Sequence, residues 1–106
     1  MNSVKLAGRL GKDPEVKQFE NSKLISFSLA TDETYRKSDG EAASRTEWHL
    51  VKAWGKLAER MESVLKKGTF VSLEGRLSTN SYTDKNGVKK YTTEIVANTI
   101  EEGPAN

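Results

Sequence analysis

The chain has 106 residues, and its 17 Lys or Arg and 15 Asp or Glu leave a formal net charge of +2, too small to indicate a nucleic-acid partner by itself. This length suits one domain with a single core, and the absence of cysteine excludes disulfides, thiolate catalysis and cysteine zinc sites. No run of about 18 apolar residues is present and the N-terminus lacks an apolar signal segment, so a cytoplasmic location is expected.

Two strands are predicted in the first 31 residues. Residues 2–10 alternate apolar and polar side chains, as a half-buried strand does. Gly8 within them indicates a bend or a close approach of another backbone. Residues 11–14 predict a turn, and residues 23–31 alternate again, which predicts the second strand.

Residues 32–44 are polar and contain the turn signal Asp39-Gly40. They predict a long hairpin that extends beyond the body of the fold. Tyr35 has no apolar neighbours in sequence with which to pack, and Arg36 and Lys37 follow it directly. Because long loops tend to carry function, this hairpin is a candidate binding segment.

The third predicted strand holds both tryptophans and ends at Gly55. A period of two places four side chains on one face: Trp48, Leu50, Lys52 and Trp54. Two interpretations are open at this point. Large aromatic side chains usually fill a core, but a lysine between them would be costly to bury without a partner. A solvated basic face that carries flat rings would instead stack nucleic-acid bases.

One helix follows the third strand. The apolar residues of 56–67 form a single helical stripe. Lys66 and Lys67 are expected in the last turn, where the helix dipole favours cations, and Gly68 is placed to end the helix.

Two more strands complete the pattern. Residues 69–83 predict the fourth strand, with Gly75 allowing a sharp bend, and residues 88–100 predict the fifth. Between them Asp84-Lys85-Asn86-Gly87 is the strongest hairpin signal in the chain. Residues 101–106 are expected to form a frayed, disordered end.

The predicted fold class is all-β, with one α-helix between strands three and four and with extended β-hairpins. Five strands avoid exposed edges by closing into a barrel, and one helix can cover the end of that barrel. The layout matches the oligonucleotide/oligosaccharide-binding barrel (OB-fold), whose strands two and three form the ligand face. The predicted domain covers residues 1–100.

Seven short motifs follow one another in the chain: Gly8-Arg9-Leu10-Gly11-Lys12-Asp13-Pro14-Glu15-Val16, Phe27-Ser28-Leu29-Ala30-Thr31, Thr46-Glu47-Trp48-His49, Gly55-Lys56-Leu57-Ala58-Glu59, Lys66-Lys67-Gly68, Glu74-Gly75-Arg76-Leu77 and Tyr91-Thr92-Thr93-Glu94. Each is weakly specific alone. In this order and spacing they resemble the bacterial single-stranded DNA-binding proteins over nearly all of residues 1–100. The resemblance implies sequence-independent binding and protection of single-stranded DNA in replication, recombination and repair.

The resemblance also implies where the DNA is bound. The family stacks bases on four aromatic side chains, which correspond here to Tyr35, Trp48, Trp54 and Tyr82. Tyrosine replaces tryptophan at two of these positions and keeps a π face with less stacking area, so binding is expected to survive. The basic side chains expected to meet phosphates are Arg36, Lys37, Lys52, Lys56 and Arg76, with Arg9, Lys12 and Lys90 as weaker candidates.

The partners implied are single-stranded DNA and further copies of the chain, because the family usually forms homotetramers. In the family a flexible linker ends in a short acidic tail that recruits replication and repair proteins. The printed sequence ends at Gly103-Pro104-Ala105-Asn106, without such a tail. Those proteins are therefore expected as partners only if the full-length protein carries one.

The sequence leaves two other classes of function to consider. One is an OB-fold replication-accessory or protein-interaction module with little DNA affinity, in which the tryptophans lie in a subunit contact. The other is an enzyme such as a nuclease, which is disfavoured because the acidic residues are scattered singly. No catalytic residue, metal site or cofactor is expected, and the lone His49 is interpreted as structural.

Overall fold

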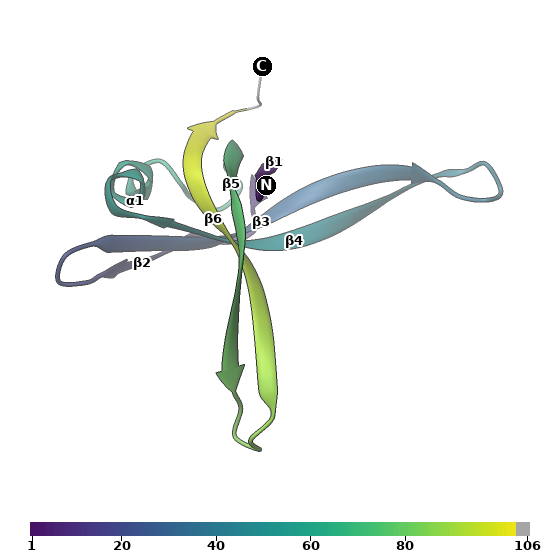
Figure 1. Cartoon of the computed structure of the whole chain (residues 1–106). Helices are drawn as coiled ribbons and strands as arrows, with labels where there is room; N and C mark the ends of the chain where they lie inside the picture. The colour runs from purple at the N-terminus through teal and green to yellow at the C-terminus, as the bar shows by residue number, and fades with distance from the viewer. Residues whose placement is uncertain (104–106) are drawn as a thin grey trace.

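The computed structural model describes residues 1–103 and contains one helix and six strands in that range (Figure 1). The elements are β1 (Val4–Leu10), β2 (Glu15–Gln18), β3 (Lys23–Arg36), β4 (Ala42–Trp54), α1 (Gly55–Glu62), β5 (Phe70–Thr83) and β6 (Lys89–Glu102). No helix of this part of the chain has the length and apolar character needed to span a membrane.

The strands close into the predicted barrel. Their order in the sheet is β1-β5-β6-β4-β3-β2, and a second pairing of β1 with β3, Arg9 opposite Ala30 and Leu10 opposite Leu29, joins the two sides. β2 pairs only with β3 and adds a short outer strand. The five-stranded OB-fold barrel is therefore confirmed, and α1 lies between its third and fourth strands.

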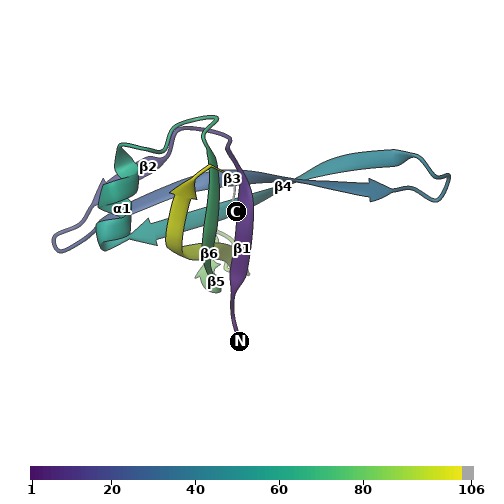
Figure 2. The same ribbon diagram turned by 90° about the horizontal axis from the view of Figure 1, so that it is seen from above.

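The core contains the interior side chains of the five barrel strands together with one face of α1. Ala58 and Met61 of α1 are buried in the same apolar cluster as the strand residues, and the helix contacts β3, β4 and β6. α1 lies at one end of the barrel (Figure 2). The fully buried large side chains of this cluster are Ile25, Leu29, Val51, Val71 and Ile100.

Two glycines allow backbones to come closer than a side chain would permit. A Cβ atom at Gly8 would lie 2.0 Å from the carbonyl oxygen of Ala30, and one at Gly75 would lie 2.1 Å from that of Val96. Gly75 also lies at the register shift between β5 and β6. The close approach predicted at Gly8 is confirmed, and at Gly75, where a bend was predicted, the structure has a close approach and a register shift.

Two long hairpins project from the barrel (Figure 1). The β3–β4 arm is the outer part of the β3–β4 hairpin, and its strands remain paired as far as Arg36 opposite Ala42. The β5–β6 arm is the outer part of the β5–β6 hairpin, paired as far as Thr83 opposite Lys89. The radius of gyration is 15.9 Å, whereas a compact chain of this length has about 13 Å. The arms account for the difference.

Two sequence-based predictions are wrong at their boundaries. α1 ends at Glu62, so Lys66 and Lys67 lie outside it, and Gly68, with a φ of 87°, lies in a later turn. The apolar stripe misled the prediction because Leu65 is buried in the core although its backbone is no longer helical. At the other end of the chain β6 continues through Glu102, which pairs with Val71, so residues 101 and 102 belong to a strand and not to the expected frayed end. Residues 104–106 lie outside the described residues.

Candidate functional site

The two tryptophans of β4 face solvent. Trp48 is 61% exposed and Trp54 is 47% exposed, whereas Val51 and Ala53, on the other face of the same strand, are fully buried. β4 thus carries the barrel core on one side and an aromatic surface on the other. The interpretation in which the indoles fill the core is excluded by this exposure. We use the name aromatic face for the outer side chains of β4, which are Trp48, Leu50, Lys52 and Trp54, together with their neighbours on the outer side of β3, β5 and β6.

Trp48 is seated on the turn that follows β1. A Cβ atom added at Gly11 would lie 2.4 Å from Cζ3 and 2.7 Å from Cη2 of the indole, so the ring rests directly against the glycine. The backbone N–H of Gly11 donates to the carbonyl oxygen of Ser28, 3.1 Å away, which fixes this turn to β3. The missing side chain at Gly11 therefore defines where the Trp48 ring lies.

Lys52 lies between the tryptophans but is already paired. Its Nζ is 2.9 Å from Oε2 of Glu94, whose side chain is only 8% exposed. Asn80 donates from Nδ2 to the other carboxylate oxygen of Glu94 at 2.8 Å. Residues from β4, β5 and β6 are joined by these contacts. A lysine can therefore lie between two indoles here, because the buried carboxylate of Glu94 compensates its charge.

Tyr82 and Arg76 continue the aromatic face along β5. Ser78 lies opposite Glu94 in the β5–β6 register, so alternate residues of β5 share the outer side with Glu94 and Lys52. Both Arg76 and Tyr82 have this parity, and Tyr82 is 55% exposed on the β5–β6 arm. Lys90 lies opposite Tyr82.

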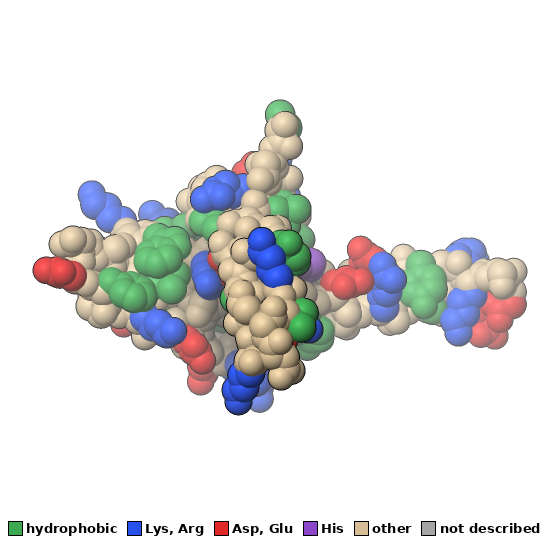
Figure 3. Space-filling model, turned by 60° about the horizontal axis from the view of Figure 1, so that its bottom comes forward, with side chains coloured by type: hydrophobic (Ala, Val, Ile, Leu, Met, Phe, Trp, Pro, Cys, Tyr) green, Lys and Arg blue, Asp and Glu red, His purple; other side chains and the backbone are tan. Residues whose placement is uncertain are grey.

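Tyr35, Arg36 and Lys37 lie at the end of the β3–β4 arm, at a distance from the barrel. Tyr35 is 47% exposed and lies opposite Ala43, so its position in the pleat is on the side opposite to Trp48. Arg36 donates to the carbonyl oxygen of Gly40 at 3.1 Å. Figure 3 shows this arm with a hydrophobic side chain flanked by positively charged ones.

The predicted site residues are therefore brought together only in part. Five of them lie on one continuous side of the barrel and the β5–β6 arm: Trp48, Lys52, Trp54, Arg76 and Tyr82. The segment of Tyr35, Arg36 and Lys37 lies apart from them, at the end of the β3–β4 arm. Lys56 is exposed at the start of α1, two residues after Trp54.

His49 points to the interior side of β4. Its Nε2 is 2.9 Å from Oγ1 of Thr31 on β3, and the residue is half-buried. Within residues 1–103 no group of three or more His, Cys, Asp or Glu side chains is arranged to hold a metal ion.

One aromatic residue of this surface was missed by the sequence analysis. The ring centroid of Phe19, in the turn between β2 and β3, lies 5.8 Å from that of Trp54. The two residues are 35 positions apart, and only the pairing of β3 with both β2 and β4 brings them together. The sequence showed an apolar residue at a hairpin turn, but such a residue does not indicate which distant residue it contacts.

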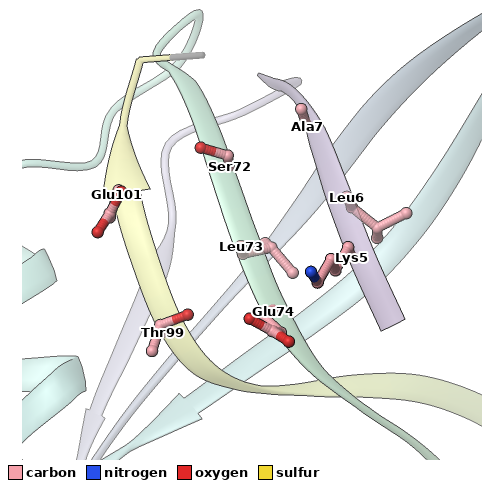
Figure 4. A pocket seen from close by; sticks show the side chains of 8 residues that line it. All are labelled: Lys5, Leu6, Ala7, Ser72, Leu73, Glu74, Thr99 and Glu101. Atoms are coloured by element: carbon pink, nitrogen blue, oxygen red, sulfur yellow. The ribbon is translucent and has the colours of Figure 1, made fainter. Parts of the chain in front are cut away.

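A separate hollow lies on the outside of β1, β5 and β6 (Figure 4). Its volume is about 350 Å³, and it is lined by two leucines, three small side chains, one lysine and two carboxylates. None of its residues belongs to the aromatic face. The lining residues are Lys5, Leu6, Ala7, Ser72, Leu73, Glu74, Thr99 and Glu101.

Residues 1–102 match the model of the single-strand binding protein family. The chain belongs to this family. A curated relative, single-stranded DNA-binding protein 1 of Chlorobaculum tepidum, is 47% identical over 103 residues, which cover 95% of this chain and 64% of the relative. The single-stranded DNA-binding protein of Neisseria meningitidis serogroup A is 43% identical over 102 residues, which cover 95% of this chain and 59% of that protein. The chain thus spans about three fifths of the length of these relatives.

Solved structures agree with the family membership. A deletion mutant of the single-stranded DNA binding protein from Thermus aquaticus superposes with a TM-score of 0.87 at 26% identity, over 98% of this chain and 51% of that one. A Plasmodium falciparum family member in complex with single-stranded DNA superposes with a TM-score of 0.86 at 30% identity, over 96% and 92% of the two chains.

Proposed function

We propose that this chain binds single-stranded DNA without sequence preference and protects it during replication, recombination and repair. The observation that carries the proposal is the exposure of Trp48 and Trp54 on the outer side of a barrel strand. Every base has a π face, so stacking on such rings tolerates any sequence and contributes about 1–3 kcal/mol per base. Tyr82 and Tyr35 would extend the stacking surface along the two arms. The binding proposed involves no catalytic step and no cofactor.

Phosphates would be met by the cations that border these rings. Arg36 and Lys37 accompany Tyr35, Lys56 follows Trp54, and Arg76 precedes Tyr82 on the same side of β5. Lys52 has a different position, because its ammonium group is paired with the buried carboxylate of Glu94. We assign Lys52 mainly to holding β4 against β6, with a smaller share in phosphate binding.

Duplex DNA should bind poorly, because its bases are already stacked on one another and hide their faces. Intrinsic fluorescence tests the proposal, since both indoles lie in the binding surface. Titration with oligothymidine should quench the tryptophan emission strongly, and a duplex of equal length should not. Unchanged emission with the single strand would favour the protein-interaction module instead. Labelled single strand incubated with magnesium should remain intact.

The family membership and the free edge of β1 support self-association. β1 pairs with β5 along one edge, while on the other edge Arg9 and Leu10 pair with β3 and the rest of the strand has no partner within residues 1–103. The remaining edge can accept a strand from another copy, and we propose a homotetramer. Mass measurement with and without oligonucleotide would give the number of subunits and of bound strands together.

Further partners depend on segments outside residues 1–106. A recruiting acidic tail, if the full-length protein carries one, would bring replication and repair proteins to the bound DNA. Single strands are exposed where chromosomal DNA is copied and repaired, so the nucleoid is the proposed place of action.

A further inference from the structure

Phe19 extends the aromatic face beyond Trp54. Its ring is tilted by 32° relative to that of Trp54, with centroids 5.8 Å apart, and each of the two residues is 47% exposed. We propose that Phe19 is an additional base-stacking residue, which receives the nucleotide next to the one stacked on Trp54. This inference rests on the proposed function and adds to it a contact on the β2–β3 hairpin.

The strand register leading up to Phe19, together with the ring contact, places Phe19 on the same outer side as the tryptophan. Lys17 lies opposite Leu24, and Leu24 lies opposite Trp54, so these three side chains share one side of the sheet. Phe19 comes two residues after Lys17. Leu24 is only 8% exposed, although it does not belong to the connected apolar cluster that fills the barrel. The outer end of this sheet therefore has an apolar patch of its own.

The patch has the character of a single-strand site. Lys17 is exposed on it and supplies a positive charge beside the rings. The hairpin that carries Phe19 is also fixed to α1, because Nζ of Lys23 lies 2.6 Å from Oε2 of Glu62. A flat ring on a fixed hairpin, next to the Trp54 ring and a cation, combines the stacking surface and the positive charge that a single strand requires.

The spacing of the rings decides how a base would bind. A base inserted between two rings requires about 7–8 Å between them, since each stacked pair needs about 3.5–4.0 Å. The 5.8 Å between the two centroids is too short. Bases would therefore stack on successive outer faces, one on Trp54 and one on Phe19.

Phe19 could instead only support the Trp54 ring, and two substitutions separate these roles. Phe19→Ala removes both the π face and the support. Phe19→Leu keeps apolar volume against Trp54 but has no π face. Val16→Ala is the matched control, because it removes an exposed apolar side chain from the same hairpin at the opposite parity.

The affinity of a fluorescently labelled oligothymidine, measured by anisotropy, gives the first test. Phe19→Ala and Phe19→Leu should each weaken binding by about five- to tenfold, the lower end of the effect of one stacked base. Val16→Ala should bind like the parent, and the thermal midpoints of all the proteins should stay close together. Equal affinity of Phe19→Leu and the parent would overturn the proposal and leave Phe19 as a support for Trp54.

Photo-cross-linking with oligonucleotides that contain 5-iodouracil gives the second test. Trypsin cuts after Lys17 and Lys23, so the peptide of residues 18–23 contains Phe19 as its only aromatic side chain, and Trp54 falls in the separate peptide of residues 53–56. We expect cross-links in both peptides. Cross-links in the Trp54 peptide alone would overturn the inference but leave the proposed function standing. Failure of the parent protein to bind any single strand would overturn both.

Discussion

Replacing Gly11 with alanine tests whether the position of the Trp48 ring against this glycine controls DNA binding. The new methyl group would lie 2.4 Å from Cζ3 and 2.7 Å from Cη2 of the indole, whereas carbon atoms in contact are about 3.5–4.0 Å apart. The ring must therefore move by about 1 Å or more. The backbone at Gly11 has no positive φ, so alanine itself is tolerated there.

Stability and binding should respond differently to this change. Trp48 is 61% exposed, so its ring can swing outward without disturbing the core, and the free energy of unfolding should change by less than about 1 kcal/mol. A displaced ring loses up to one stacked base, worth about 1–3 kcal/mol. The dissociation constant for oligothymidine should then rise by about 5- to 150-fold.

Anisotropy titrations and urea unfolding measure the two quantities on the same protein. Trp48→Ala and the Gly11→Ala/Trp48→Ala double variant complete a mutant cycle, in which Gly11→Ala should have no further effect once the indole is gone. Gly8→Ala is the contrasting control, because its methyl group would meet the Ala30 carbonyl oxygen, part of the backbone that closes the barrel. That variant should unfold at a much lower urea concentration.

Two outcomes would refute this reasoning. If Gly11→Ala binds like the parent, the position of the Trp48 ring does not matter for DNA binding. If Gly11→Ala weakens the Trp48→Ala variant as much as it weakens the parent, the effect does not pass through the indole.

Three further predictions concern the aromatic face and the β3–β4 arm. Trp54→Ala should raise the dissociation constant for oligothymidine by about 5- to 150-fold and Trp54→Phe by much less; equal losses in anisotropy titrations would argue against stacking. Lys52→Met should lower the free energy of unfolding, measured in urea, by about 1–3 kcal/mol, because the buried Glu94 loses its cation; the loss is limited because Lys52 is itself partly exposed. A Lys52→Met/Glu94→Gln variant should recover most of this stability. If it recovers none, the ion pair is not the cause of the loss. Lys37→Gln should make the slope of log affinity against log salt concentration less steep by about 0.7; an unchanged slope would remove Lys37 from the phosphate contacts.

The sequence was sufficient to predict features that depend on neighbours in the chain. The alternation around Val51 correctly separated the interior of β4 from its outer side. The Asp84 turn was also predicted correctly: its carboxylate accepts from the backbone N–H groups of Asn86 and Val88, and Gly87 has a φ of 79°.

Contacts between distant parts of the chain were not predictable in this way. Glu94 is separated from Lys52 by 42 positions, and nothing in either segment names the other as its partner. The same holds for the contact of Phe19 with Trp54. The Lys52–Glu94 pair depends on the pairing of β4 with β6, and the Phe19–Trp54 pair depends on the registers of β3 with β2 and β4. Local spacing therefore placed Trp48 and Trp54 on the outer side of β4, but it did not indicate Phe19 or Glu94 as neighbours of that side.

The two arms give the chain an uneven resistance to local opening. Each arm is a two-stranded ribbon that continues past the barrel without a core of its own, and such ribbons are only marginally stable in water. Their amide hydrogens should exchange with deuterium far sooner than those of the barrel interior. A ligand that lies along the arms would slow that exchange, so the pattern of newly protected amides would trace its path residue by residue.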